Sequence, residues 1–71
     1  MEIKLSRHAR RQMKWRKITE AEIGAVVTQP DKLEDSVKGR KNAFKTVGIR
    51  MLKVTYKQED ECAVVVTAVV K

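Results

Sequence analysis

The stretch Cys62-Ala-Val-Val-Val-Thr-Ala-Val-Val70 contains nine residues without a charge, in a chain of 71 residues of which 35% are charged. Nine residues are too few to span a membrane, and a run this rich in Val favours a strand over a helix. Because both faces of the run are apolar, we expect it to be an interior strand of a sheet.

The segment Ile49 to Lys57 precedes this run and alternates between apolar and polar residues, as a half-buried strand does. Residues 58–61 are polar and fit a four-residue hairpin loop, which would place Lys57 opposite Cys62. A register slip of one residue would exchange the two faces of the hairpin. This register predicts a face under the helices formed by Leu52, Val54, Tyr56, Ala63, Val65 and Thr67.

Two helices are predicted before the hairpin. Ser6 is a good N-cap, and the residues after it indicate a helix from about Arg7 to Arg16. A capping box that begins at Thr19 starts a second helix, from about Glu20 to Thr28. The second helix ends before Pro30, because the residue that precedes a proline is displaced from helical conformation.

The remaining segments complete an α+β fold. Met1 to Leu5 alternates like an extended lead-in, Leu33 to Val37 indicates a weak edge strand, and Asn42 to Val47 indicates a further strand. A basic turn, Lys38 to Lys41, separates the last two. We therefore predict a single domain over residues 1–71, in which two N-terminal helices pack on one face of a four-stranded antiparallel meander sheet.

Length and composition limit the classes of protein. A chain of 71 residues buries only about 60% of its unfolded surface, which favours a homodimer. The single cysteine, Cys62, cannot form an internal disulfide, so we expect a reducing, cytoplasmic compartment and interpret the residue as a small buried hydrophobe rather than a reactive thiol. No signal peptide or membrane span is predicted. One His, one Cys and scattered carboxylates indicate neither a metal centre nor a bound cofactor.

The net charge of +7 is unevenly distributed along the chain. Residues 1–17 contain seven Lys or Arg and one acid, residues 37–57 contain seven and no acid, and the segment between them is acidic. The pattern fits either a solvated surface or a face that binds a polyanion such as RNA. Trp15 and Tyr56 could stack on bases or could belong to the core and its rim. The predicted nucleic-acid-binding residues are Arg11, Arg40, Lys41, Lys45, Arg50 and Lys53.

The pattern Ser6-x-His8-Ala9-x-x-Gln12-Met13-x-x-Arg16-x-Ile18-Thr19, followed by Glu22-Ile23, Gln29-Pro30 and Val66-Thr67-Ala68, resembles a widespread family of small prokaryotic proteins known only as a domain of unknown function. That family looks distantly similar to the RelE and BrnT type toxins, in which two N-terminal helices lie on a small antiparallel sheet. The chain departs from the pattern at Gln12, where the family usually has Arg. It also lacks any acidic, aromatic or imidazole group after Glu61, whereas RelE-like nucleases commonly draw catalytic groups from that region.

The resemblance implies RNA binding, metal-independent RNA cleavage on the ribosome or on free RNA, and an antitoxin-like protein partner. Such cleavage needs a base, an acid and cations that stabilise the phosphorane. Imidazole is the side chain whose ordinary pKa suits the first two roles, and His8 shares a helical face with Arg16. We therefore assign the catalytic roles to His8 and Arg16, while Arg11 and Lys41 could also stabilise the phosphorane.

Other roles are open for the same residues. His8 could pack on the sheet edge or bond to a strand carbonyl, and Arg16 could form an ion pair with Glu20 or Glu22. The second hypothesis is a non-catalytic nucleic-acid-binding or protein-interaction module with the same fold. A basic helix lying on a membrane is less favoured, because the apolar stripe of the first helix is needed for the core.

Overall fold

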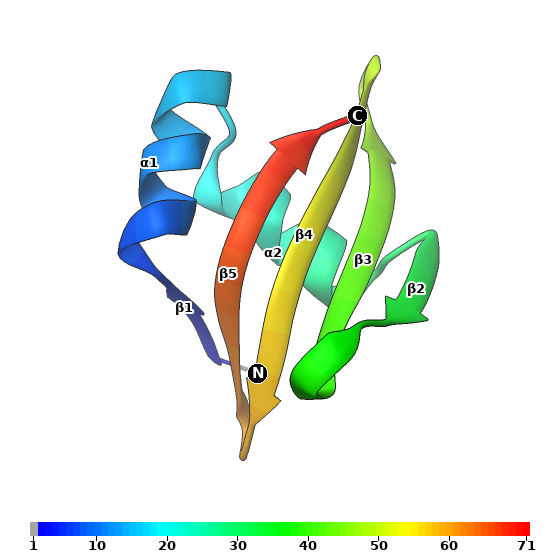
Figure 1. Cartoon of the computed structure of the whole chain (residues 1–71). Coiled ribbons are helices and arrows are strands. Elements are labelled where there is room, and N and C mark those ends of the chain that lie inside the picture. The colour runs from blue at the N-terminus through cyan, green and yellow to red at the C-terminus, as the bar shows by residue number, and fades with distance from the viewer. Residues whose placement is uncertain (1) are drawn as a thin grey trace.

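A computed structural model describes residues 2–71 of the chain, which form one mixed five-stranded sheet and two α-helices. In Figure 1, α2 lies behind the sheet, where it crosses β4 and β3, and α1 lies beside β5 at the left. The elements in chain order are β1 (Glu2–Leu5), α1 (Arg7–Arg16), α2 (Glu20–Thr28), β2 (Lys32–Asp35), a 3-10 turn η1 (Val37–Gly39), β3 (Arg40–Val47), β4 (Arg50–Glu59) and β5 (Cys62–Val70).

The predicted four-stranded antiparallel meander is wrong, because a fifth strand precedes the helices. The lead-in forms β1 and pairs in parallel with β5, from Glu2 opposite Cys62 to Leu5 opposite Val65. The resulting strand order is β1-β5-β4-β3-β2, with only the β1–β5 pair parallel. Four residues give a weak strand signal, and the partner of β1 lies about 60 positions away in the sequence, so no local turn indicates this pairing.

The predicted register of the long hairpin is also wrong. Glu59, rather than Lys57, lies opposite Cys62, and the turn contains only two residues. The first of them, Asp60, adopts a φ of 51°, a left-handed conformation that Asp tolerates better than most residues. A bulge then shifts the pairing between Thr55 and Tyr56.

The bulge changes which residues of β5 face the helices. Before it, Ala63 and Val65 are buried under the helices, as predicted, together with Leu52, Val54 and Tyr56 of β4. After it, Ala68 replaces Thr67 as the buried residue. The extra residue, Val66, is therefore accommodated without exposing the apolar face of the strand.

Both helices begin and end as predicted from their capping residues. Ser6 Oγ accepts a hydrogen bond from the backbone N–H of Ala9 over 3.0 Å and donates to the carbonyl of Val66 over 3.1 Å. Thr19 and Glu22 form the predicted capping box, with distances of 3.1 and 2.9 Å. Neither helix is long and apolar enough to cross a membrane, in the part of the chain that the structure describes.

The hydrophobic core lies on one side of the sheet only. The side chains of α1, α2 and the linking Ile18 fill the space between the helices and the central strands β3, β4 and β5. The opposite side of the sheet, here called the open face, carries no helix and faces the viewer in Figure 1. The buried side chains are Ala9, Met13, Ile18, Ile23, Val26, Val27, Ala43, Leu52, Val54, Tyr56, Ala63, Val65 and Ala68.

Candidate nucleic-acid interface

Helix α1 carries the densest positive charge of the molecule. Ala9 and Met13 are its only buried residues, and Gln12 is half-buried, so every basic side chain of the helix is exposed. No acidic residue occurs between Arg7 and Lys17. We call the following set the α1 basic surface: Arg7, Arg10, Arg11, Lys14, Trp15, Arg16 and Lys17.

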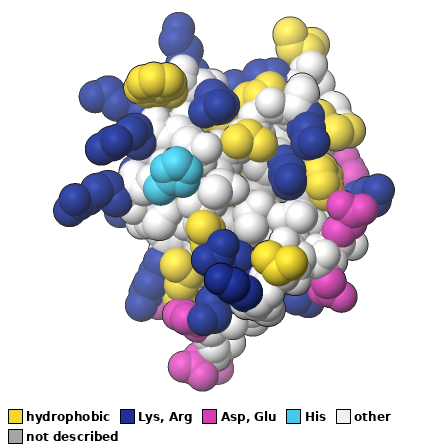
Figure 2. All heavy atoms as spheres, viewed as in Figure 1, with side chains coloured by type: hydrophobic (Ala, Val, Ile, Leu, Met, Phe, Trp, Pro, Cys, Tyr) yellow, Lys and Arg dark blue, Asp and Glu magenta, His cyan; other side chains and the backbone are white. Residues whose placement is uncertain are grey.

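The cations of the α1 basic surface are not neutralised by neighbouring acids. The four ion pairs among residues 2–71 involve Lys32, Lys45, Arg50 and Lys57, and none of them includes a residue of α1. Exposed cations without acidic partners interact freely with an approaching polyanion. Figure 2 shows these side chains gathered along the left margin of the molecule, where α1 lies.

Trp15 stands between two hollows on this helix. Its side chain is 81% exposed, although Trp is usually largely buried. A larger hollow of about 570 Å³ is lined by Arg7, Arg10, Arg11, Lys14 and Trp15, and a smaller one of about 220 Å³ is lined by His8, Arg11, Gln12, Trp15 and Arg16. Because both hollows share Arg11 and Trp15, an indole and a guanidinium are presented to each of them.

The predicted catalytic residues lie together in the smaller hollow. His8 and Arg16 are both exposed, and His8, in cyan, is visible on the α1 side of Figure 2. His8 makes no hydrogen bond to the residues that the structure describes, so of the alternatives left open for it, the bond to a strand carbonyl is not formed there. Gln12, between them on the helix, is engaged elsewhere: its Oε1 accepts a hydrogen bond from the backbone N–H of Ala68 over 2.9 Å.

Arg50, one of the predicted nucleic-acid-binding residues, is held by three groups of the protein. Its guanidinium donates to the carbonyl of Arg16 over 2.9 Å and to that of Lys17 over 3.4 Å, and it pairs with the Glu22 carboxylate at 2.8 Å. It therefore ties the end of α1 and the start of α2 to β4. The ion pair with Glu22 that the sequence suggested for Arg16 is made by Arg50 instead.

Lys45 is engaged in a similar way. Its ammonium donates to the carbonyl of Gln29 over 2.9 Å and lies 3.7 Å from the carboxylate of Asp31. The same carboxylate accepts from the backbone N–H of Thr46 over 3.0 Å. Lys45 thus anchors the segment after α2 to β3, and binding a phosphate would break these contacts.

The other predicted binding residues lie on different faces. Lys53 and Arg40 point to the open face, whereas Lys41 lies opposite the buried Tyr56 on the side of the helices and is half-buried. Arg11 belongs to the α1 basic surface. The structure therefore does not bring the basic residues of the 37–57 segment together on one surface. Of the two roles left open for Tyr56, the structure places it in the core, because its side chain is 5% exposed.

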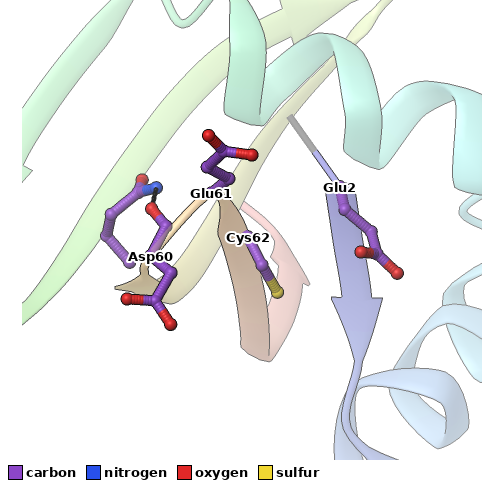
Figure 3. A pocket seen from close by; sticks show the side chains of 5 residues that line it. Glu2, Asp60, Glu61 and Cys62 are labelled. Atoms are coloured by element: carbon purple, nitrogen blue, oxygen red, sulfur yellow. Dashed lines mark hydrogen bonds between the residues drawn. The ribbon is translucent and has the colours of Figure 1, made fainter.

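The hollow around Cys62 has the opposite charge. It is lined by Glu2, Gln58, Asp60, Glu61 and Cys62, and Figure 3 shows the acids of the hairpin turn and of β1 around the cysteine. Cys62 is a free, half-buried cysteine, less buried than the sequence suggested. Three carboxylates repel phosphates, so this end of the sheet is not part of a polyanion surface. No group of three or more potential metal ligands occurs among residues 2–71.

The sequence signal for the α1 basic surface was the first basic block, residues 1–17. Arg7, Arg10, Lys14 and Lys17 were not among the predicted binding residues, because charge alone does not distinguish a binding face from a solvated one. The structure adds the exposure of Trp15, which depends on the packing of α1 against β5.

Fold and surface together define a small, basic α+β domain with a polybasic helix at the edge of its sheet. The chain belongs to the family described as Domain of unknown function (DUF4258), whose model matches residues 5–70. No curated protein and no solved structure matches the chain. The predicted resemblance to a family of unknown function is confirmed, whereas nothing in these comparisons links the chain to RelE or BrnT type toxins.

Proposed function

We propose that the protein binds single-stranded RNA through the α1 basic surface. In this proposal, Trp15 stacks on an unpaired base while the surrounding arginines and lysines hold the flanking phosphates. Single-strand binders combine these two features, an exposed aromatic platform and a cationic track along the backbone. The observation that carries the proposal is the 81% exposed Trp15 between two hollows lined by cations without acidic partners.

A single strand fits this geometry better than a duplex. The bases of an RNA duplex are stacked on one another, so an indole on a convex helix cannot reach a base face without opening the duplex. The six cations lie within three turns of one helix, which suits a short segment of backbone. The predicted homodimer and the predicted antitoxin-like partner are tested by neither the fold nor the comparisons and stay predictions.

RNA cleavage is a second proposal, favoured by the presence of His8, Arg11 and Arg16 in one hollow. His8 would take the proton of a 2′-hydroxyl, whose oxygen would then attack the adjacent phosphorus. The P–O5′ bond would break, leaving a 2′,3′-cyclic phosphate on one product. The 5′-oxygen of the other product would take a proton from solvent water, and the protonated His8 would release its own proton to solvent. The two guanidinium groups would stabilise the charge of the phosphorane.

The intrinsic fluorescence of Trp15 tests the binding proposal directly, because Trp15 is the only tryptophan of the chain. We expect titration with single-stranded RNA to quench its emission, and added salt to reverse the quenching. A duplex of the same sequence is the control and should quench far less. Unchanged emission with single-stranded RNA at low salt would contradict the proposal, and equal quenching by single-stranded DNA would extend it to both nucleic acids.

The cleavage proposal is tested on the same RNA by following its fragment ends. We expect cyclic phosphate ends with the wild type and none with His8→Ala, while the quenching of Trp15 is retained. Binding without fragments from either protein would identify a non-catalytic module.

A further inference from the structure

The single phenylalanine of the chain lies outside the hydrophobic core. Phe44 is half-buried on β3 between residues whose side chains face the helices, so its ring points to the open face of the sheet. The core contains Tyr56 as its only aromatic residue. Figure 2 shows that hydrophobic and cationic side chains are interspersed over the open face, whereas most acidic side chains lie at its margins.

The strand register places cations on both sides of the Phe44 ring. Lys53 on β4 and Lys32 on β2 both lie opposite Phe44. Their ammonium groups are 5.9 and 6.0 Å from the centre of the ring, within the range of cation–π contacts. Val69 of β5 continues the same row beyond Lys53. An aromatic ring is thus flanked by two groups that can bind phosphates.

The neighbouring row of the open face is polar. Thr67, Thr55 and Asn42 lie side by side on β5, β4 and β3. Thr55 Oγ1 and Asn42 Oδ1 are 2.7 Å apart and share a hydrogen bond. This bond leaves the amide N–H groups of Asn42 without a partner among the described residues, and such donors suit the carbonyl oxygens and ring nitrogens of a base.

The charges of this face favour a polyanion over a second copy of the chain. Lys53 and Arg40 form no ion pair among the described residues, while Lys32 pairs with Glu34 at 3.2 Å and Lys57 with Glu59 at 3.5 Å. Such exposed pairs contribute little, so a phosphate can replace the carboxylate. Two copies packed face to face would instead bring their unpaired lysines and arginines together.

We propose that the open face around Phe44 is a second base-stacking subsite for the RNA strand held by α1. This inference rests on the proposed function of the α1 basic surface. The smaller hollow of α1 borders β5, because Gln12 in its wall bonds to Ala68. Phe44 lies two strand spacings from β5, about 10 Å, so an RNA strand that passes from α1 over β5 needs only a few more nucleotides to reach it.

The test compares short and long oligouridylates, of about 4 and about 12 nucleotides, within the range of site sizes of single-strand binders. In the wild type, Trp15 should respond to both. Phe44→Leu keeps an apolar side chain but removes the π face. It should weaken binding of the long oligomer about fivefold or more and leave binding of the short oligomer unchanged. Phe44→Trp should restore binding of the long oligomer, and circular dichroism checks that each variant is folded.

Moving the tryptophan to position 44 gives an independent measurement of binding at the proposed subsite. In the double variant Trp15→Phe, Phe44→Trp, the only tryptophan lies at the proposed subsite, and its emission should respond to the long oligomer. Wild-type affinity of Phe44→Leu for both oligomers, or no response of the moved tryptophan, would overturn the subsite while leaving the function of α1 intact. No response of Trp15 to either oligomer would instead refute the function of α1.

Sedimentation equilibrium tests whether a second copy of the chain covers the open face instead. A wild-type dimer that Phe44→Leu dissociates would show that it does, and would overturn the subsite.

Discussion

Arg50 shows how a cation that counts toward net charge can be unavailable for binding. Its guanidinium lies at the C-terminus of α1, where the last carbonyl oxygens carry partial negative charge, and it also meets the Glu22 carboxylate. The arginine therefore stabilises the junction of three elements. A residue of this kind cannot be distinguished from a free arginine in the sequence, because its partners lie 28 to 34 positions away.

Glu22 makes the stability of this junction dependent on pH. Its carboxylate accepts from the backbone N–H of Thr19 and pairs with Arg50, and these contacts hold its pKa below the ordinary value of 4.5, against the opposing effect of partial burial. A carboxyl whose pKa is lower in the folded state stabilises the fold above the unfolded pKa. We therefore expect this contribution to be complete above pH 4.5 and to disappear as the pH falls through the lower folded pKa.

The variant Glu22→Gln separates the charge of Glu22 from its capping role, because glutamine can also form a capping box. We expect the free energy of unfolding in urea to fall by about 1 kcal/mol at pH 7, the upper end of the range for surface pairs, because both side chains are only partly exposed. The difference from the wild type should vanish in acid. Glu20→Gln, an exposed acid in the same helical turn without a contact to Arg50, is the control. An equal loss of unfolding free energy in both variants would mean that the effect comes from the helix dipole and not from the ion pair with Arg50.

Among the helices and strands, the sequence predicts correctly those features that depend on contacts between residues close in the chain. The ends of both helices follow from caps at Ser6 and Thr19, which involve residues three positions apart. The pairing of β1 with β5 and the bulge opposite Thr55 and Tyr56 depend on contacts between distant segments. The hairpin was therefore placed correctly by its composition, but its register was shifted by two residues at the turn.

Gln12 attaches α1 to the edge of β5 beyond the end of β1. β1 pairs with β5 only as far as Val65, and Gln12 supplies an acceptor for the backbone N–H of Ala68 three positions later. Gln12→Leu would leave this N–H unsatisfied, so we expect a loss of about 1–3 kcal/mol in the free energy of unfolding. Hydrogen exchange at the Ala68 amide should accelerate. Gln12→Glu keeps an acceptor oxygen and should retain protection of this amide. Equal exchange rates of the Ala68 amide in both variants would contradict the proposed hydrogen-bonding role of Gln12.

At the scale of the whole molecule, the sequence predicted the amount of positive charge but not its availability. Both basic blocks contain seven cations, and the second was the stronger candidate because it contains no acid. In the fold, acids from outside the block reach three of its cations: Asp31 meets Lys45, Glu22 meets Arg50, and Glu59 meets Lys57. The first block keeps its charges free, because α1 turns only two small or flexible residues, Ala9 and Met13, to the core.

The salt dependence of RNA binding distinguishes binding by the cations of α1 alone from binding by the cations of both basic blocks. For single strands the slope of log K against log salt is about −0.7 for each phosphate neutralised, so the six cations of α1 give a slope no steeper than about −4. All fourteen cations of the two blocks would give about −10. We expect the shallower value for a short oligonucleotide that reaches α1 alone. Arg11→Gln should make the slope shallower by about 0.7. Lys45→Gln removes the same formal charge but should leave the slope unchanged and lower the free energy of unfolding. Equal slopes for the two variants would mean that the contacts of Lys45 open when RNA binds, and that the second block takes part after all.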